Sequence, residues 1–452
     1  MNNTERGGKT TKALLTGMRS LYFVGICGIS MGGLAHMARE AGWRVRGCDR
    51  ANGSREAHLL FREGIAVEPE KSATLGDAEA VIYTAAISED SPAIAEALAR
   101  GIPLISRADF LAALMEPYES RIVVAGMHGK STTVGMLAAI LTEAERNPTV
   151  SCGAPLAPGE PAYRLGGNQI FLAEGCEYRD SFLSLSPTLA VVTNIDLDHP
   201  DYFPDLGAVK SSFLQFLAAS DERVLGGDCR ALLDIAPCGA VLFGFSPCAD
   251  IRGQMTDRGF EVWDRENCLG ILSLSLPGAY NRQNALAAVA AGLRLGIPFS
   301  VIQKALRGFR GVGRRMESCG TFLGARVYLD YAHHPTEMTA AIRGIQEDGA
   351  RVLCIFQPHT FTRTRALWDD FIAALKLPDR ACLLDIYPAR EPPLQGITSR
   401  RLSEEAGIPY APDFSAAVAW AKENARTGDT LLLMGAGDID GLVRLLDGSE
   451  SK

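Results

Sequence analysis

The chain has 452 residues, which at about 150 residues per domain indicates roughly three domains. Acidic residues outnumber basic ones by 53 to 45, and the net charge of −8 argues against a general affinity for nucleic acid or anionic membranes. Hydrophobic residues make up 47% and charged residues 22%, a globular composition that excludes general disorder.

The amino-terminal residues 1–19 include basic side chains but no continuous apolar core, so we do not expect them to be a secretory signal. We expect them to be a flexible leader. No run of about 18 apolar residues predicts a membrane-spanning helix. Eleven cysteines without a CxxC pair favour reduced thiols. These features predict a cytoplasmic protein without membrane insertion or a nucleic-acid partner.

Short apolar runs alternate with helical patterns along the chain, which is typical of α/β layers around mostly parallel sheets. In chain order, we predict strands at residues 21–24, 43–47, 80–84, 121–125, 169–173, 189–193, 327–330, 352–356, 381–386 and 430–434, with further strands between 224 and 276. Helices are predicted at residues 91–100 and 281–295. The expected fold has three domains, each around a mostly parallel sheet: a Rossmann-like domain over 20–117, a central P-loop ATPase domain over 118–312 and a Rossmann-like domain over 313–452.

A glycine loop at residues 25–33 follows the first strand. It reads GxxGxxxG and misses the GxGxxG pattern because Cys27 stands where the second glycine belongs. Asp49 lies at a suitable distance along the chain to meet a ribose hydroxyl. The loop predicts either a dinucleotide or a nucleotide-sugar site, and its structural alternative is close packing of a helix on a strand.

A second glycine loop, residues 126–132, lies between a strand and an apolar helix. Backbone N–H groups and the helix dipole would converge there on phosphate oxygens. Lys130 would reach the β- and γ-phosphates, and the Ser131 hydroxyl would bind Mg²⁺. Only the GxxGK[ST] half of the motif is present, since Val124 stands where a further glycine is usual. A tight structural turn is the alternative, but the flanking strand and helix favour phosphate binding.

Two acidic clusters follow the next strands, where α/β proteins place ligands. The clusters are Glu174, Glu177 and Asp180, and Asp196, Asp198, His199 and Asp201. Each could simply cap a helix or line a solvated loop. Beside a phosphate loop, however, carboxylates favour a magnesium site.

Polar and basic side chains also gather at two strand ends of the third segment. They are Asp330, His333, His334 and Glu337 in one stretch, and Gln357, His359, Arg363 and Arg365 in the next. Such a combination predicts a site for an anionic substrate. A zinc site is not favoured, because no suitable set of Cys and His ligands accompanies these histidines.

Taken together, the motifs resemble the Mur ligases, the ATP-dependent amide-forming enzymes of peptidoglycan precursor synthesis. The likeness extends from residue 21 to about residue 440 and includes GMHGKSTT, AEGCEYRDSF, TNIDLDHPDYF, PGAYNRQNALAA, FRGVGRRME, LDYAHHPTEM, FQPHTFTRT, YPAREPP and MGAGDI. The pair DYAHHPTE and QPHTFTRT points to the alanine-adding branch of the family. The resemblance implies that ATP and Mg²⁺ are used to join L-alanine to the carboxylate of UDP-N-acetylmuramate through an acyl phosphate. It places the protein in cell wall biogenesis, and thereby in cell shape and cell division, as a monomer or homodimer.

The resemblance also implies roles for single residues. ATP would lie on Gly126, Met127, His128, Gly129, Lys130, Ser131 and Thr132, with Asn281 and Asn284 near adenine and with Arg315 and Asp330 completing the site. One Mg²⁺ would be held by Ser131 and Glu174, and a second by His199. The UDP-sugar would contact Gly28, Ser30, Gly32 and Asp49. The implied catalytic residues are Lys130, Glu174, His199, His333 and Arg363.

Several positions depart from the family pattern. Met127 and Ser131 replace threonines, and Tyr280 replaces a histidine. Residues 67–71 stand where the family often carries a Gly-His pair near uracil. Lys210 is more simply explained by a structural role than by the modification that some relatives carry.

Three alternatives stay open. A recycling ligase of the same family would join a preformed peptide, but it usually has Phe and Ala where this chain has Tyr331 and Glu337. A nicotinamide-dependent dehydrogenase would use the first glycine loop and leave the second without a purpose. A nucleotide-binding paralogue without turnover is the third, and intact Lys130, Glu174 and His199 argue against it.

Overall fold

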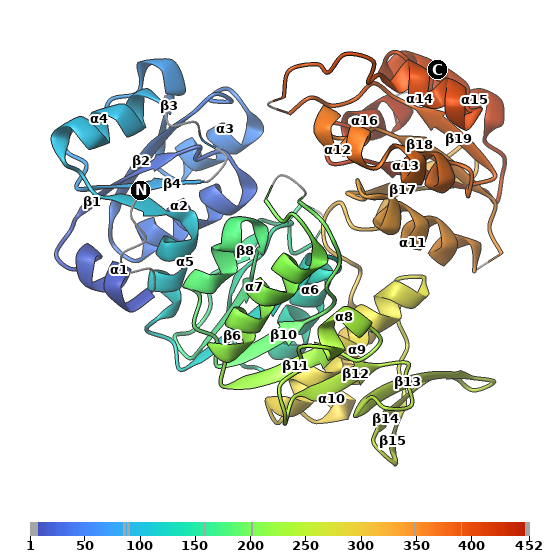
Figure 1. Ribbon diagram of the computed structural model, residues 1–452, viewed down its shortest axis with the longest axis horizontal. Coiled ribbons are helices and arrows are strands. Elements are labelled where there is room, and N and C mark those ends of the chain that lie inside the picture. The colour runs from blue at the N-terminus through green and yellow to red at the C-terminus, as the bar shows by residue number, and fades with distance from the viewer. Residues whose placement is uncertain are drawn as a thin grey trace. The chain divides into compact units, whose positions relative to one another are not determined.

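The computed structural model describes residues 8–84, 87, 91–157, 159–199, 202–347, 349–389 and 391–447. The chain divides into two compact units. The first holds the described residues of Met1–Leu156, Glu160–Ser273 and Gln283–Phe309, and the second those of Ala157–Gly159, Leu274–Arg282 and Arg310–Lys452. Two sheets lie in the first unit and one in the second (Figure 1). The predicted α/β class with three mostly parallel sheets is confirmed, whereas the predicted domain bounds stay a prediction.

The first sheet has five parallel strands in the order β3-β2-β1-β4-β5. They are β1 (Ser20–Val24), β2 (Arg44–Asp49), β3 (Ala66–Pro69), β4 (Ala80–Tyr83) and β5 (Leu104–Ser106). The helices of this segment are α2 (Ile29–Glu40), α3 (Arg55–Arg62), η1 (Glu70–Ser72), α4 (Pro92–Arg100) and α5 (Arg107–Met115). The strand order reverses between β1 and β4, and α/β proteins bind ligands at such a switch point.

The expectation of a flexible leader over residues 1–19 is wrong for the part that the structure describes. Residues Gly8–Leu15 form helix α1, and residues 1–7 lie outside the described range. Thr11 and Leu15 are buried, and a Cβ on Gly8 would meet the Ala112 carbonyl of α5 at 2.6 Å. The helix forms because packing on α5 stabilises it, which local sequence does not reveal.

The second sheet has ten strands in the order β15-β14-β13-β12-β11-β10-β6-β9-β7-β8. They are β6 (Ser120–Ala125), β7 (Thr149–Ser151), β8 (Tyr163–Arg164), β9 (Ile170–Glu174), β10 (Leu189–Val192), β11 (Glu222–Gly226), β12 (Val241–Gly244), β13 (Ile251–Thr256), β14 (Gly259–Asp264) and β15 (Asn267–Ile271). The pairs β7–β8, β13–β14 and β14–β15 are antiparallel, and the other pairs are parallel. In Figure 1 the last three strands extend the parallel part at one edge.

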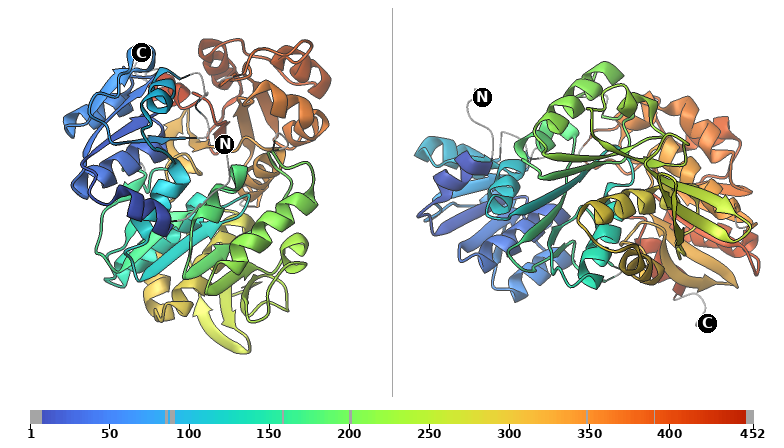
Figure 2. Two further views of the ribbon diagram at one scale, coloured as in Figure 1. Left: turned by 60° about the vertical axis from the view of Figure 1, so that its left-hand side comes forward. Right: turned by 90° about the horizontal axis from the view of Figure 1, so that it is seen from below.

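Helices cover both faces of this sheet. They are α6 (Lys130–Glu143), η2 (Tyr178–Ser184), α7 (Leu206–Ala218), α8 (Arg230–Leu233), α9 (Ala279–Arg294) and α10 (Phe299–Gly308). On one face, Val123 and Ala125 share a core with Phe213 and Phe216 of α7. In the right-hand view of Figure 2, α9 and α10 (yellow) lie on the face opposite α7 (green). Burial on both faces explains why β6, β9 and β10 read as nearly continuous apolar runs.

The third sheet has the order β16-β17-β20-β18-β19, in which the pair β16–β17 is antiparallel and the rest are parallel. Its strands are β16 (Glu317–Phe322), β17 (Ala325–Asp330), β18 (Val352–Phe356), β19 (Arg380–Leu383) and β20 (Thr430–Met434). Its helices are α11 (Pro335–Gln346), α12 (Phe361–Ala366), α13 (Trp368–Leu375), α14 (Ser399–Ala406), α15 (Phe414–Asn424) and α16 (Gly441–Asp447). Every residue of the central strand β20 is buried.

All eleven cysteines are free thiols, as the sequence predicted. Within the described part of the chain, no helix is both long and apolar enough to cross a membrane.

Candidate active site

The loop from Gly126 to Thr132 joins the buried strand β6 to helix α6, as predicted. Gly126 (φ 131°) and Gly129 (φ 84°) have backbone conformations that side chains disfavour. A Cβ would lie 2.2 Å from Thr193 Oγ1 at the first glycine and 2.2 Å from Asn284 Oδ1 at the second. Both positions therefore require glycine.

Two N–H groups of this loop have partners within the protein. Met127 N–H donates to the Asn194 carbonyl (3.2 Å), and His128 N–H donates to Asn194 Oδ1 (2.9 Å). These two hydrogen bonds to Asn194 stabilise the conformation of the loop. Among the described residues, no side chain caps the amino end of α6, so the N–H groups of its first turn, which includes buried Thr132, are available to an anion.

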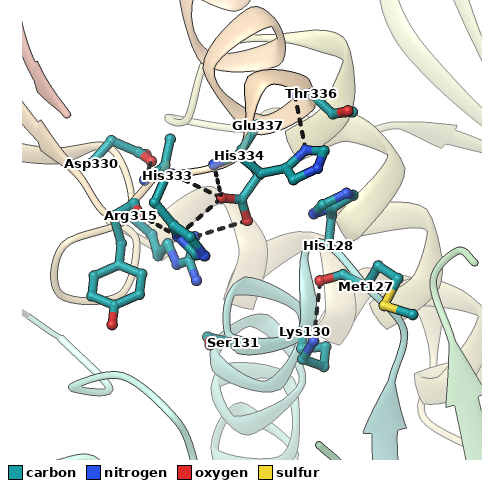
Figure 3. Close-up of polar contacts among 12 residues, drawn as sticks. Met127, His128, Lys130, Ser131, Arg315, Asp330, His333, His334, Thr336 and Glu337 are labelled. Atoms are coloured by element: carbon teal, nitrogen blue, oxygen red, sulfur yellow. Dashed lines mark hydrogen bonds and ion pairs between the residues drawn. The ribbon is translucent and has the colours of Figure 1, made fainter. Parts of the chain in front are cut away.

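Lys130 turns back toward its own loop. Its Nζ donates to the carbonyls of Gly126 (2.5 Å) and Met127 (3.1 Å), and the latter contact is drawn in Figure 3. Glu177 completes the set, with its two carboxylate oxygens 3.0 and 3.2 Å from Nζ. Burial by itself would lower the pKa of Lys130, but Glu177 and Glu174 outweigh it and raise that pKa. Burial would raise the pKa of Glu177, but Lys130 and His199 lower it, so the pair is ionised.

Ser131 and Glu174 form the best candidate for a magnesium site. Ser131 Oγ donates to Glu174 Oε2 at 2.8 Å, and the Gly153 N–H donates to the same oxygen at 2.8 Å. A hydroxyl and a carboxylate are the oxygen ligands that Mg²⁺ combines with phosphate and water, so these two residues fit the ion. Within the described residues, no group of three or more His, Cys, Asp or Glu side chains is arranged to hold a metal.

His199 lies close to the carboxylates of Glu177 and Asp198. Its Nε2 is 3.5 Å from Glu177 Oε1 and 3.9 Å from Asp198 Oδ2, and its ring packs against Tyr178 with centroids 4.7 Å apart. Asp196 lies 3.8 Å from His128 Nε2, and Asp201 falls outside the described residues. The role of His199 at a second Mg²⁺ stays a prediction.

Met127 and Tyr280 depart from the family pattern, and Asn281 and Asn284 are the residues expected near adenine. Met127 is buried in the apolar core of the first unit, where the threonine of relatives would place a hydroxyl. Asn284 lies against Gly129, whereas Asn281 donates to the Pro277 carbonyl at 2.7 Å. Tyr280 is half-buried, and desolvation of its hydroxyl, together with the charge of Asp330, raises the pKa of that hydroxyl.

In the first sheet, Asp49 holds the glycine loop. Its carboxylate accepts the N–H groups of Cys27 and Ala51, each at 2.9 Å. Gly32 N–H donates to the carbonyl of Gly28, the residue before α2, at 2.8 Å. These hydrogen bonds to backbone N–H groups fix the conformation of the glycine loop. The contact of Asp49 with ribose or uracil stays a prediction.

Ser30 has a partner that the sequence did not indicate. Arg107, the first residue of α5, donates to Ser30 Oγ at 3.1 Å. A guanidinium beside the glycine loop suits a diphosphate. The separation of 77 residues explains why no local pattern pointed to it.

In the second unit, Glu337 organises the end of β17. Its carboxylate accepts the N–H of His333 (3.1 Å) and lies 3.6 Å from Arg315 Nη1, as Figure 3 shows. Asp330 accepts the N–H groups of Met316 (2.8 Å) and Ala332 (2.7 Å). Burial raises the pKa of Asp330 to about 6, although Arg315 and these N–H groups oppose the shift.

His333 is a neutral imidazole. Burial and the nearby Arg363 lower its pKa to about 4, although Glu337 opposes the shift. Its Nδ1 lies 2.9 Å from the Tyr331 carbonyl and 3.3 Å from Glu337, and both of these groups accept hydrogen bonds. The proton therefore resides on Nδ1, and Nε2 carries the lone pair.

His359 lies near His333. Its ring lies 6.1 Å from that of His333 and is stacked on Tyr387 at 5.7 Å. Burial and Arg363, whose Nη1 is 3.5 Å from His359 Nδ1, lower the pKa of His359 to about 4. The structure thus brings His333, His359 and Arg363 together as the sequence predicted.

Arg314 is a residue that sequence reasoning missed in favour of its neighbour Arg315. It donates to the carbonyls of Gly435 (3.1 Å) and Gly437 (2.8 Å), so it holds the glycine loop after β20. Both arginines lie over the Tyr331 ring, at 4.9 and 5.0 Å. Lys210 pairs with Asp234 at 2.8 Å, which agrees with a structural use.

Family models match three stretches of the chain. They are the Mur ligase family catalytic domain at residues 20–119, the Mur ligase middle domain at 124–292, and the glutamate ligase domain of Mur ligase at 314–437.

Curated relatives match nearly the whole chain. The chain is 38% identical to the UDP-N-acetylmuramate–L-alanine ligase of Desulfosudis oleivorans, over 93% of this chain and 96% of that protein. It is 37% identical to the enzyme of the same name from Acetivibrio thermocellus, over 93% and 94% of the two chains.

Solved structures share the fold. The UDP-N-acetylmuramate-alanine ligase of Thermotoga maritima matches with a TM-score of 0.82 and 24% identity, over 96% of this chain and 100% of that one. A murein peptide ligase from Psychrobacter arcticus matches with a TM-score of 0.72 and 23% identity, over 96% and 98%. Because relatives above 30% identity span nearly the whole chain, this protein belongs to the Mur ligase family.

Proposed function

We propose that this chain is an ATP-dependent ligase that joins L-alanine to the carboxylate of UDP-N-acetylmuramate in peptidoglycan precursor synthesis. The observation that carries the proposal is 38% identity, over 93% of the chain, to a relative named for that reaction. The glycine loop with Lys130, Ser131 and Glu174 supports it, since these groups suit ATP and Mg²⁺. Tyr331 and Glu337 favour alanine over a preformed peptide.

The reaction requires activation of the substrate carboxylate. The first-turn N–H groups of α6 and the Lys130 ammonium would neutralise charge on the phosphates of ATP. The carboxylate attacks the γ-phosphate and releases ADP, which leaves an acyl phosphate. Ser131 and Glu174 would hold Mg²⁺, which supplies further charge neutralisation.

The second step forms the amide. The amine of L-alanine attacks the acyl phosphate, and the tetrahedral intermediate collapses to amide and inorganic phosphate. We assign the neutral His333, with its lone pair on Nε2, to accept a proton from the amine. Arg363 would bind an anionic group of the substrates. The first sheet would hold the UDP-sugar near Gly28, Ser30, Gly32 and Asp49.

The test is phosphate release from ATP and Mg²⁺, with and without UDP-N-acetylmuramate, across single amino acids. Release that requires both the nucleotide-sugar and L-alanine supports the proposal, and Lys130→Ala should abolish it. Lys304→Ala is the matched control, because Lys304 is a surface lysine paired with Glu143. No release with any amino acid, despite ATP binding, would favour the paralogue without turnover.

The cytoplasmic location and the monomeric or dimeric state remain predictions. Analytical sedimentation would measure the oligomeric state.

A further inference from the structure

The ammonium group of Lys130 has used all of its donors within the protein. An ammonium carries three protons, and Nζ has three partners: the carbonyls of Gly126 and Met127 and the carboxylate of Glu177. If Lys130 binds phosphate, at least one of these contacts must be given up. The structure therefore raises the question of which partner yields.

Glu177 differs from the other two partners. The carbonyls belong to the loop itself, whereas Glu177 lies at the start of η2 and is 47 residues away in sequence. It alone carries a negative charge, as a phosphate does, so the two anions would compete for the same cation. Glu177 also has a second neighbour, His199 Nε2 at 3.5 Å, which stays beside the carboxylate if Lys130 leaves.

The segment that carries Glu177 is firmly anchored. Arg179 and Asp180 have positive φ values of 52° and 56°, which turn the chain sharply after Tyr178. The Asp180 carboxylate accepts the Tyr202 hydroxyl at 2.5 Å and also the Ser212 hydroxyl. Because this anchoring is independent of Lys130, Glu177 would keep its place when the ammonium moves.

We propose that Glu177 is a positioning residue that competes with the phosphates of ATP for Lys130. It holds the ammonium in the nucleotide-free protein and releases it when phosphate arrives. This inference rests on the proposed use of the loop for ATP. It implies that ATP must displace Glu177 from Lys130, and that this displacement lowers the net affinity of the loop for ATP.

The experiment is calorimetric titration of ATP, with divalent ions removed by EDTA, into wild-type protein and Glu177→Gln. Loss of the carboxylate charge removes the competitor for Lys130, so ATP should bind about 3- to 10-fold more tightly. Adenosine has no phosphate, so Glu177→Gln and wild-type protein should bind it with equal affinity. The gain in ATP affinity should also be absent when Glu177→Gln is added to Lys130→Ala, because it acts through that ammonium. Unchanged or weaker ATP binding by folded Glu177→Gln overturns the proposal.

Glu261→Gln is the matched control. Glu261 is an equally buried glutamate of the same unit, paired with Arg258, and its substitution should leave ATP binding as in wild type. If Glu177→Gln does not fold, Glu177→Asp retains the charge but shortens the reach to Lys130. This variant should also bind ATP more tightly than wild type, and equal or weaker binding overturns the proposal.

The two proposals fail in different ways. If wild-type protein does not bind ATP, or binds it equally well after Lys130→Ala, the assignment of the loop is wrong and this inference falls with it. If Lys130→Ala weakens binding as expected but Glu177→Gln does not strengthen it, only the competition is wrong.

Discussion

The Ser131 hydroxyl donates a hydrogen bond to the Glu174 carboxylate across 2.8 Å, and the Gly153 N–H binds the same carboxylate oxygen. The hydroxyl lies in the first turn of α6 and the carboxylate ends β9, so two neighbouring strand ends supply one pair of oxygen ligands. Serine serves here as well as the usual threonine, because the contact uses only the hydroxyl.

Ser131→Ala should lower the affinity for Mg²⁺, measured as the concentration required for half-maximal phosphate release, by about 10- to 100-fold. It removes one oxygen ligand and leaves Glu174 without its hydroxyl partner. Ser131→Thr is the control, since it keeps the hydroxyl, and it should stay within about threefold of wild type. Equal Mg²⁺ requirements for the alanine and threonine variants would contradict this site.

Gly129→Ala should lower both stability and ATP affinity. The new Cβ would have a disfavoured φ of 84° and would lie 2.2 Å from Asn284 Oδ1, so the loop or α9 must shift. Gly42→Ala separates the two effects, because Gly42 also has a positive φ (102°) but has no atom within 4 Å of its Cβ. The control should lose about 1 kcal/mol and keep wild-type ATP binding. Thermal unfolding and nucleotide titration measure the two quantities, and wild-type ATP binding by Gly129→Ala would refute the expectation.

Met127→Thr should destabilise the first unit by about 1–3 kcal/mol, although it restores the usual residue of the family. Met127 is buried in an apolar core, so threonine leaves a cavity and places a hydroxyl among apolar side chains. The free energy of unfolding, from urea titration, is the measurement. Met255→Thr provides the control, because Met255 is 58% exposed. Equal losses in the two variants would show that burial is not the cause.

The titration of His333 should lower the free energy of unfolding of the second unit at acidic pH. Its folded pKa of about 4 lies below the ordinary value of 6.5, so between these pH values only the unfolded chain binds the proton. Its contribution to stability is complete above pH 6.5 and is lost as the pH falls toward 4, by up to about 3 kcal/mol.

Comparison of His333→Asn with wild type isolates this effect. Asp330 acts in the opposite direction, because its pKa is raised to about 6, but it is present in both proteins. The asparagine variant should lose less stability than wild type between pH 7.5 and pH 4.5, as thermal unfolding would show. Parallel profiles for His333→Asn and wild type would rule out this role.

The sequence by itself determined the alternation of strands and helices, the class of the fold and the glycine loop before α6. These features follow from neighbours along the chain: apolar runs of strand length, and glycines where the backbone needs a positive φ. It also indicated that His333, His359 and Arg363 gather at strand ends, because parallel strands bring their carboxyl ends to one edge of a sheet. The two strands, β17 and β18, are not adjacent as expected, since β20 lies between them.

Only the tertiary structure decided which of the acidic residues meets Lys130. Glu174, Glu177 and Asp180 look equivalent in sequence. In the structure Glu174 ends β9, Glu177 precedes η2 and Asp180 lies in the sharp turn after Tyr178, so the three carboxylates reach different partners. Likewise, helix α1 depends on packing against α5, which begins almost 100 residues later. Contacts between distant segments depend on the directions in which side chains leave a folded backbone, and local patterns do not carry that information.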